Sequence, residues 1–132
     1  MENNFLSVKG IRKSFGSVEV LKGIDLKVNR GDVISILGPS GSGKTTFLSV
    51  IAGQDNRYEG EVRFNGKEIK SIGLDKYRRT AVSMIYQNYN LFPLLSVQEN
   101  IQYPLELKKI PRKQVATLVR EVRERVELPV AY

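Results

Sequence analysis

The residues with the clearest chemical potential form the run Gly38–Thr45, which reads GPSGSGKT. This run, called the phosphate loop below, fits the pattern G-x-x-x-x-G-K-[ST] at every fixed position. Its three glycines allow the main chain to turn tightly and bring its N–H groups close to phosphate oxygens. Lys44 adds a positive charge for the β and γ phosphates, and the Thr45 hydroxyl suits Mg²⁺. The run therefore predicts binding of nucleotide phosphates together with Mg²⁺.

A loop of this kind must be held between a strand and a helix. Val33–Leu37 is a short apolar, β-branched run typical of a buried strand, and Thr46–Ala52 can continue as a helix. Further strands are predicted before it, because Phe5–Val8, Val18–Leu21 and Ile24–Val28 show apolar clusters and period-two alternation typical of antiparallel pairing. A turn at Asn29–Asp32 leads into the phosphate-loop strand.

The rest of the chain continues as a mixture of strands and helices. Gly60–Phe64 alternates as a half-buried strand, and Asn65-Gly66 is a strong two-residue hairpin signal. We further predict a short helix over Leu74–Arg79, a buried strand over Ala81–Tyr86 and a helix that starts at the capping box Ser96–Glu99. A last helix is predicted to have Pro111 in its first turn. Its apolar residues recur on one face, and they are Val115, Leu118, Val119, Val122 and Val126.

The composition limits the reactions that these residues can perform. The chain has 132 residues, with no histidine and no cysteine. This excludes a histidine general base, a Ser–His nucleophile, a histidine or thiolate metal site and a disulfide framework within these residues. No run approaches the roughly 18 consecutive apolar residues that a membrane span requires. We therefore expect a soluble chain.

The basic residues are in excess but do not form one block. The formal net charge is +7, from 21 Lys and Arg against 14 Asp and Glu. A stripe of basic residues interleaved with aromatics would be typical of nucleic-acid binding, whereas here the excess is spread over three regions. We favour solvated faces, or a surface suited to phosphates or to the vicinity of a membrane, over specific nucleic-acid binding.

Several motifs follow one another in a fixed order: Ser14–Gly16, Gly38–Thr46, Gly60–Val62 with Asn65-Gly66, Tyr86–Pro93 and Ser96–Ile101. Together they resemble the first half of an ATP-binding cassette (ABC) domain. The segment Leu91–Asn100 is most similar to ATPase subunits of the lipoprotein-release and macrolide or bacteriocin export type. The resemblance implies an α/β fold of the P-loop NTPase kind, with an N-terminal antiparallel β subdomain and phosphate-loop core over about 1–86 and the start of a helical subdomain over about 87–132.

The resemblance assigns roles to single residues. It makes Phe15 the aromatic residue on which adenine stacks. Tyrosine is commoner at this position in the family, but stacking uses the ring face, which phenylalanine also has. Without the resemblance, Phe15 is also compatible with a place in the hydrophobic core. Gln87 matches the glutamine whose amide reaches Mg²⁺ or the attacking water, although such an amide can also satisfy local backbone. The predicted cofactors are ATP and Mg²⁺, with nucleotide contacts from Phe15, Gly38, Ser40, Gly41, Ser42, Gly43, Lys44, Thr45 and Thr46, catalytic roles for Lys44 and Gln87, and metal contacts from Thr45 and Gln87.

The same resemblance implies two partners at the cytoplasmic face of a membrane. One is the transporter's membrane subunit, contacted through Gln87–Phe92, and the other is a second ATP-binding subunit in the full-length protein. The aromatics near Gln87 suit a docking groove, because tyrosine is amphipathic, while ordinary core packing is the alternative. These aromatics are Tyr86, Tyr89, Phe92 and Tyr103.

The motifs of the family's catalytic half do not occur in these residues. No run of four apolar residues is followed by Asp-Glu, no Leu-Ser-Gly-Gly-Gln motif is present, and no histidine can serve as the switch residue. Hydrolysis in this family requires such groups, including one that orients the attacking water. We therefore expect an N-terminal fragment that binds Mg·ATP with little or no hydrolysis. Its uncovered strand edges predict self-association or marginal stability.

Two other classes of protein also use a phosphate loop or a basic surface. A small nucleotide kinase or GTPase would need its own Mg²⁺ aspartate and, for a GTPase, an Asn-Lys-x-Asp base reader, and neither is found. A non-catalytic module that senses ATP, or binds nucleic acid through its basic surface, stays open. Adenine preference with Mg²⁺ would support the cassette, guanine preference the GTPase, and salt-sensitive DNA binding the last module.

Overall fold

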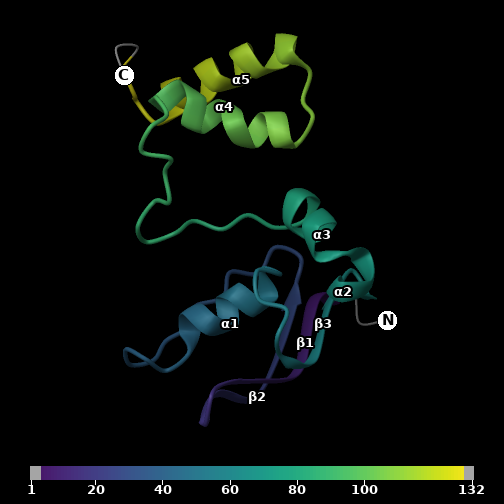
Figure 1. The fold of residues 1–132 in the computed structure, drawn as a ribbon. Helices are drawn as coiled ribbons and strands as arrows, with labels where there is room; N and C mark the ends of the chain where they lie inside the picture. The colour runs from purple at the N-terminus through teal and green to yellow at the C-terminus, as the bar shows by residue number, and fades with distance from the viewer. Residues whose placement is uncertain (1–3, 130–132) are drawn as a thin grey trace. The chain divides into compact units, whose positions relative to one another are not determined.

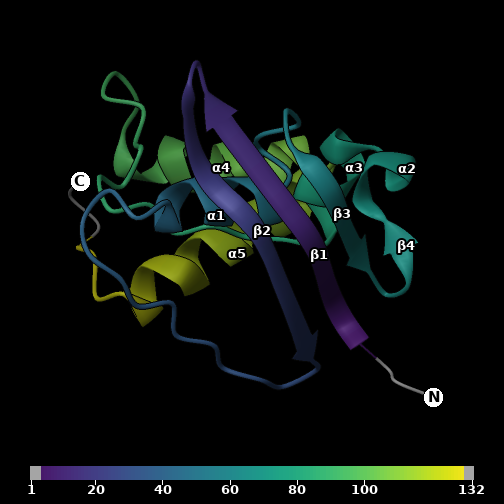
Figure 2. The ribbon, with the colours of Figure 1, turned by 90° about the horizontal axis from the view of Figure 1, so that it is seen from below.

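The helices and strands fall into two units, one that ends at Met84 and one that begins at Ile85. The structure, a computed structural model, describes residues 4–129. Figure 1 labels the elements along the chain except β4, which is labelled in Figure 2. The first unit holds β1 (Asn4–Phe15), β2 (Val18–Asn29), α1 (Lys44–Ile51), β3 (Glu59–Phe64), β4 (Lys67–Glu68), α2 (Ile69–Ile72) and α3 (Leu74–Thr80), and the second holds α4 (Val97–Leu107) and α5 (Arg112–Arg125).

The first unit is built on an antiparallel sheet in the order β2-β1-β3-β4, seen across its strands in Figure 2. Val8 on β1 pairs with Leu26 on one side and with Val62 on the other. The structure confirms antiparallel strands over the first thirty residues. The two clusters Val18–Leu21 and Ile24–Val28 belong to a single long strand, β2.

The predicted turns also form. Asn65 and Gly66 join β3 to β4 with φ angles of 48° and 77°, and both values lie in the left-handed region that a tight two-residue hairpin turn requires. At the end of β2 the Asp32 N–H donates to the Asn29 carbonyl oxygen at 3.2 Å. The short helix expected over Leu74–Arg79 is confirmed as α3.

The hydrophobic core of the first unit lies between the sheet and its three helices. All three longer strands contribute apolar side chains, and α1 packs against them on the face that Figure 2 shows behind β2. Aromatic rings extend this core, since Phe64 contacts both Phe5 and Tyr77 edge to face, with centroids 5.0 Å and 5.7 Å apart. The buried members are Val8, Ile11, Leu21, Phe47, Val50, Val62, Ile69 and Tyr77.

Two predicted strands are absent from the described residues, and here the sequence prediction was wrong. Val33–Leu37 and Ala81–Tyr86 lie outside every helix and strand of the described residues, and Ala81 belongs to a turn. Val33 and Leu37 are 94% and 91% exposed, and Ile85 is 98% exposed. A buried parallel strand needs a hydrogen-bonded neighbour on its edge, and no segment of residues 4–129 pairs with either run.

The second unit is a pair of helices with a defined start. Ser96 caps α4: its hydroxyl accepts from the Glu99 N–H, and the Glu99 carboxylate accepts from the Ser96 N–H, which confirms the capping box. Helix α5 begins at Arg112, one residue after Pro111. Within residues 4–129, no helix is long and apolar enough to span a bilayer.

The apolar face predicted for the last helix is only partly covered. Val115 and Val119 are buried on α5, and Leu118 is partly buried. Val122 is 39% exposed and Val126, the residue after the helix, is 56% exposed. The sequence periodicity therefore identified the helix, but it overestimated the length of its buried stripe.

Candidate nucleotide-binding site

The phosphate loop forms a compact turn that leads directly into helix α1. The Ser42 N–H donates to the Pro39 carbonyl oxygen at 3.2 Å, and the Phe47 N–H donates to the Gly43 carbonyl oxygen at 2.8 Å. Gly43 is the N-cap of α1 and has no side chain with which to cap the first turn. The free N–H groups of that turn, together with the helix dipole, are a general binding site for anions.

Lys44 folds back over the phosphate loop. Its ammonium group donates to the carbonyl oxygens of Gly38 and Pro39 at 2.6 Å and 2.7 Å, and to the Ser42 hydroxyl at 3.1 Å. These contacts place a positive charge inside the curve of the loop, next to the first turn of α1. Lysine is a point charge on a flexible stem, so it can follow a phosphate group without a rigid bidentate geometry.

Close packing fixes the loop at both ends. A Cβ atom at Gly43 would lie 2.9 Å from Cγ1 of Val20 and 3.0 Å from Cδ2 of Leu21, so the start of α1 rests directly on β2. A Cβ atom at Gly38 would lie 2.7 Å from the Ser42 hydroxyl oxygen. Side chains at these two positions would therefore displace β2 or fill the inside of the loop.

A cleft of about 530 Å³ runs beside the phosphate loop. One wall comes from β2 and is largely apolar, and the other comes from the extended segment 34–39. The lining also includes Ser42, Gly43 and Lys44 of the phosphate loop. The phosphate loop therefore borders an open cleft and not the packed core. Thr45, the predicted metal ligand, is exposed in the first turn of α1.

Phe15 lies at the end of β1, opposite Val18 of β2. It is 55% exposed, which leaves ring surface free for contact with a base. The ammonium group of Lys13 lies 5.0 Å from the centroid of the Phe15 ring, within the range of a cation–π interaction. Phe15 and the phosphate loop both belong to the first unit.

An ion pair next to Phe15 was not predicted from the sequence. Lys13 is buried. Its ammonium donates to Asp55 Oδ1 at 3.0 Å and to the Arg57 carbonyl oxygen at 2.6 Å, and it lies 2.8 Å from Asp55 Oδ2. Partial burial acts to raise the pKa of the Asp55 carboxyl, but hydrogen bonds from Lys13 and the Arg57 N–H outweigh it, so the pKa is lowered. No pattern in the sequence pairs Lys13 with Asp55, because the two residues lie 42 positions apart.

Gln87 belongs to the second unit, where it is exposed in a turn. The turn is held by a hydrogen bond from the Tyr89 N–H to the Tyr86 carbonyl oxygen at 3.2 Å, and Tyr89 and Asn90 have positive φ angles of 60° and 50°. The placement of Gln87 against the phosphate loop therefore stays a prediction. Among the aromatics expected near it, Phe92 and Tyr103 meet edge to face, with centroids 5.1 Å apart.

The segment after this turn is anchored by Asn100, whose structural role the sequence did not reveal. The Asn100 side-chain oxygen accepts from the Phe92 N–H at 2.8 Å. Its amide nitrogen donates to the carbonyl oxygens of Phe92, Leu95 and Ser96 at 3.0 to 3.1 Å. Next to this anchored backbone, apolar side chains are exposed: Tyr89 (79%), Leu91 (66%), Phe92 (49%) and Leu94 (96%).

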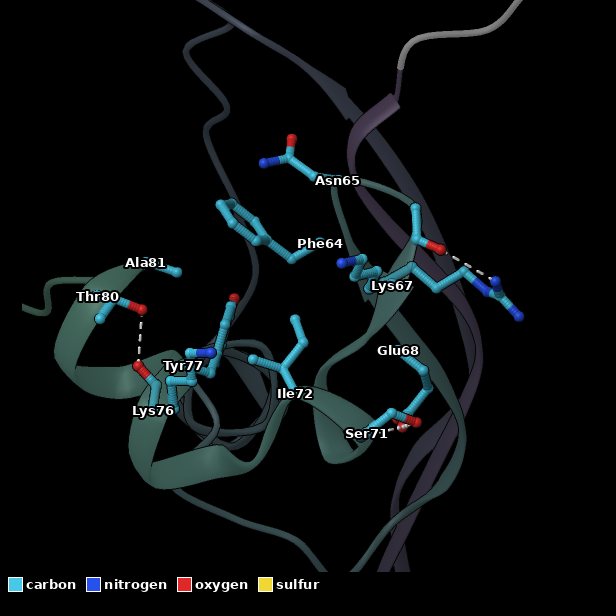
Figure 3. Close-up of a pocket in the computed structure, with 12 residues that line it drawn as sticks. Phe64, Asn65, Lys67, Glu68, Ser71, Ile72, Lys76, Tyr77, Thr80 and Ala81 are labelled. Atoms are coloured by element: carbon cyan, nitrogen blue, oxygen red, sulfur yellow. Dashed lines mark hydrogen bonds between the residues drawn. The ribbon is translucent and has the colours of Figure 1, made fainter.

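A second pocket in the first unit contains none of the predicted site residues. It measures about 690 Å³ and lies between the β3–β4 hairpin and the helices α2 and α3. Figure 3 shows Phe64 and Tyr77 close to each other among its lining side chains, with Lys67 and Lys76 also around it. The mixed lining does not indicate one ligand chemistry, so we place the candidate site at the phosphate loop.

Comparison with known proteins identifies the family of this chain. A family model described as ABC transporter matches residues 21–130. The chain belongs to the ABC transporter family. Its relatives include the spermidine/putrescine import ATP-binding protein PotA of Clostridium novyi (strain NT), with 38% identity over 128 residues that cover 97% of this chain and 36% of that protein. They also include the bacitracin export ATP-binding protein BceA of Halalkalibacterium halodurans, with 41% identity over 124 residues, covering 89% and 49%.

Solved ABC cassettes share the fold. The dimeric cassette MJ0796 in a post-hydrolysis state bound to ADP and Pi has a TM-score of 0.83 at 31% identity, covering 95% of this chain and 58% of that chain. The expected P-loop NTPase-like α/β fold is thereby confirmed. This ABC chain thus spans between about a third and about three fifths of the length of these relatives.

The residues at the ABC site fit the cofactors that the family uses. ABC ATP-binding domains bind ATP with Mg²⁺, act with membrane subunits and dimerise. Here the phosphate loop offers N–H donors and the Lys44 ammonium to an anion, and a Cβ at Gly38 would intrude on that loop. Residues 4–129 hold no cluster of three acidic side chains that could bind a metal ion alone. The Thr45 hydroxyl is an oxygen ligand of the kind that Mg²⁺ accepts beside phosphate oxygens and water.

Proposed function

We propose that this chain binds Mg·ATP through its phosphate loop, as the nucleotide-binding part of an ABC transporter's ATP-binding subunit. The observation that supports this most directly is the position of the Lys44 ammonium, 2.6 Å and 2.7 Å from the carbonyl oxygens of Gly38 and Pro39 beside the start of α1. A cation and a set of unpaired N–H groups at the same place match the charge of a triphosphate.

The roles proposed for individual residues follow from the resemblance to ABC domains. Gly38, Ser40, Gly41, Ser42, Gly43, Lys44, Thr45 and Thr46 contact the phosphates, Phe15 supports the adenine ring, and the Thr45 hydroxyl and the Gln87 amide approach Mg²⁺. When bound, Mg²⁺ neutralises charge that develops on the phosphates. The exposed side chains of Phe15 and Thr45 support these assignments, because both can reach a ligand from the surface.

Hydrolysis requires more than these residues supply. Residues 1–132 contain no histidine and no Asp-Glu pair. We propose that Lys44 and Gln87 take part in catalysis, but that these residues by themselves bind nucleotide without efficient turnover. In phosphoryl transfer, the group that positions the attacking water is needed for the rate rather than for binding.

The proposed partners are a membrane subunit, contacted through the Gln87–Phe92 region, and a second ATP-binding subunit. Exposed apolar side chains in that region support docking, because aromatic residues are enriched at protein interfaces. The segment Leu91–Asn100 supports an exporter of the lipoprotein-release, macrolide or bacteriocin type as the finer assignment. The relatives include both an importer and an exporter, so this assignment rests on that segment alone.

A calorimetric titration of the intact protein with Mg·ATP tests the proposal. Lys44→Ala removes a charge-assisted contact with phosphate, and we expect the affinity to fall by about tenfold to a hundredfold. Lys22→Ala is the matched control, because Lys22 is an exposed lysine on β2 and is not among the residues that line the cleft. Absence of binding in the folded parent, or equal affinities for the two variants, would contradict the proposal.

A further inference from the structure

Lys13 is a buried cation with a complete set of partners. Its side chain is only 6% exposed, although a buried ammonium is costly unless it is paired and hydrogen-bonded. It meets this requirement through the two carboxylate oxygens of Asp55 and the Arg57 carbonyl oxygen, at 2.6 to 3.0 Å. The ammonium group, which has three N–H donors, therefore lies within 3.0 Å of three oxygen atoms.

The same nitrogen atom also lies beside the proposed adenine platform. It is 5.0 Å from the centroid of the Phe15 ring, and a cation within about 6 Å of a ring centroid is attracted by the ring face. Lys13 and Phe15 are two positions apart on β1, and residues with this spacing share one face of a strand. Lys13 is thus fixed at its charged end while it contacts the ring.

The acceptors of Lys13 belong to the segment that follows the phosphate-loop helix. Helix α1 begins at Lys44 and ends at Ile51, and Asp55 lies four residues beyond that end. Within this segment, the Arg57 N–H donates to the Asp55 carboxylate at 2.8 Å. The ion pair therefore links β1, which carries Phe15, to the segment that follows α1. The phosphate loop lies at the other end of the same helix.

We propose that Lys13 is a positioning residue for adenine recognition, which holds the Phe15 ring in place relative to the phosphate loop through Asp55. This inference rests on the proposed stacking of adenine on Phe15. Lys13 itself does not touch the nucleotide, because its ammonium is already enclosed by protein acceptors. Its effect is confined to the base end of the ligand, where the ring position matters.

Two ligands separate this role from a general packing role. ATP needs both the phosphate loop and the base platform, whereas inorganic tripolyphosphate needs only the phosphate loop. Lys13→Met keeps most of the aliphatic stem but removes the ammonium group. In the intact protein with Mg²⁺, we expect the affinity for ATP to fall by about threefold to tenfold and the affinity for tripolyphosphate to change by less than about twofold.

Arg12→Met is the matched control. Arg12 is the neighbouring residue on β1 and makes an exposed ion pair with Glu19 at 2.8 Å, so its replacement removes the same charge from the other side of the strand. We expect no selective loss of ATP affinity. Should Lys13→Met fold poorly, Asp55→Asn weakens the same ion pair from the other partner and should give the same selectivity to a smaller extent.

The outcomes distinguish this inference from the proposed function. If Phe15→Ala weakens ATP selectively but Lys13→Met and Asp55→Asn do not, stacking stands and the positioning role is wrong. If Lys13→Met weakens ATP and tripolyphosphate equally, Lys13 serves only the stability of the fold. If Phe15→Ala leaves the preference for ATP over tripolyphosphate unchanged, both the stacking and the positioning role are wrong, while phosphate binding by Lys44 is unaffected.

Discussion

Gly43 lies so close to Val20 of β2 that no side chain fits between them. A Cβ atom at position 43 would lie 2.9 Å from Val20 Cγ1, and the backbone there has a φ angle of 93°, which L-residues rarely adopt. We therefore expect Gly43→Ala to lower the free energy of unfolding by about 2 to 3 kcal/mol, because strain and overpacking act together. Urea denaturation measures this change.

Gly41 provides the control for that substitution. It also has a positive φ angle, 77°, but a Cβ atom there would meet nothing within 4 Å. Gly41→Ala should therefore show the backbone strain alone, about 1 kcal/mol. Equal losses for the two variants would show that the contact between Gly43 and β2 does not contribute to stability.

Removal of two buried tyrosine hydroxyls is expected to change the free energy of unfolding in different ways. The Tyr77 hydroxyl donates to the Ile51 carbonyl oxygen at 2.9 Å, at the last residue of α1. Tyr77→Phe should lower the free energy of unfolding by about 1 kcal/mol, because that carbonyl loses its donor. The Tyr58 hydroxyl is buried without a hydrogen-bond partner among residues 4–129, so Tyr58→Phe should be neutral or slightly stabilising. Thermal unfolding of both variants checks the contrast, and a larger loss at Tyr58 would contradict it.

The ion pair of Asp55 with Lys13 predicts a specific dependence of stability on pH. The pKa of the Asp55 carboxyl lies below its ordinary value of 3.8 in the folded chain, so the charged form favours folding. This contribution is complete above the unfolded-state pKa, which is close to the ordinary value, and is lost as the pH falls through the lower folded-state value.

Asp55→Asn tests that dependence. The variant should be less stable than the parent at pH 7, and the difference should persist down to about pH 5 and shrink below about pH 4. Urea denaturation across this pH range gives the two curves. A difference that stays constant from pH 7 to pH 3 would show that the charge of Asp55 contributes nothing to folding.

Asn100 is expected to control the segment that presents Phe92. Asn100→Ala removes the acceptor of the Phe92 N–H and the donor to three carbonyl groups, so amide exchange at Phe92 should become faster. Asn100→Asp keeps the acceptor and loses the donors, and it should give an intermediate rate. Hydrogen exchange followed by mass spectrometry measures both variants, and unchanged rates would show that the amide does not hold this segment.

The same segment gives a test of docking. Replacement of Tyr89 and Phe92 by alanine removes two exposed rings without altering the backbone contacts of Asn100. We expect weaker association with the membrane subunit in a pull-down assay, because aromatic side chains contribute strongly at interfaces. Glu106→Ala on α4, an exposed and non-aromatic position, is the control. Equal recovery of all variants would argue against docking at this surface.

Features that depend on neighbouring residues could be predicted from the sequence. The hairpin at Asn65-Gly66 follows from the φ angles that this pair tolerates, and the capping box follows from the spacing of Ser96 and Glu99. The phosphate loop is likewise specified by glycines and a lysine within eight positions. In each case the interacting groups are adjacent in the chain.

Features that depend on distant partners could not be predicted. The Lys13–Asp55 pair joins residues 42 positions apart, and no periodicity signals it. Val33–Leu37 has the β propensity of a strand, but propensity cannot supply the neighbouring edge on which strand pairing depends. Val122 continues the helical pattern of Val115 and Val119 but lies where the packing of α5 ends.

The self-contacts of Lys44 affect the heat of binding. Because its ammonium already donates to the carbonyl oxygens of Gly38 and Pro39, a phosphate that approaches it exchanges partners with the protein instead of meeting a free cation. The enthalpy gained at Lys44 is then a difference between two sets of hydrogen bonds. A larger share of the affinity must come from water released by the triphosphate and from the N–H donors at the start of α1.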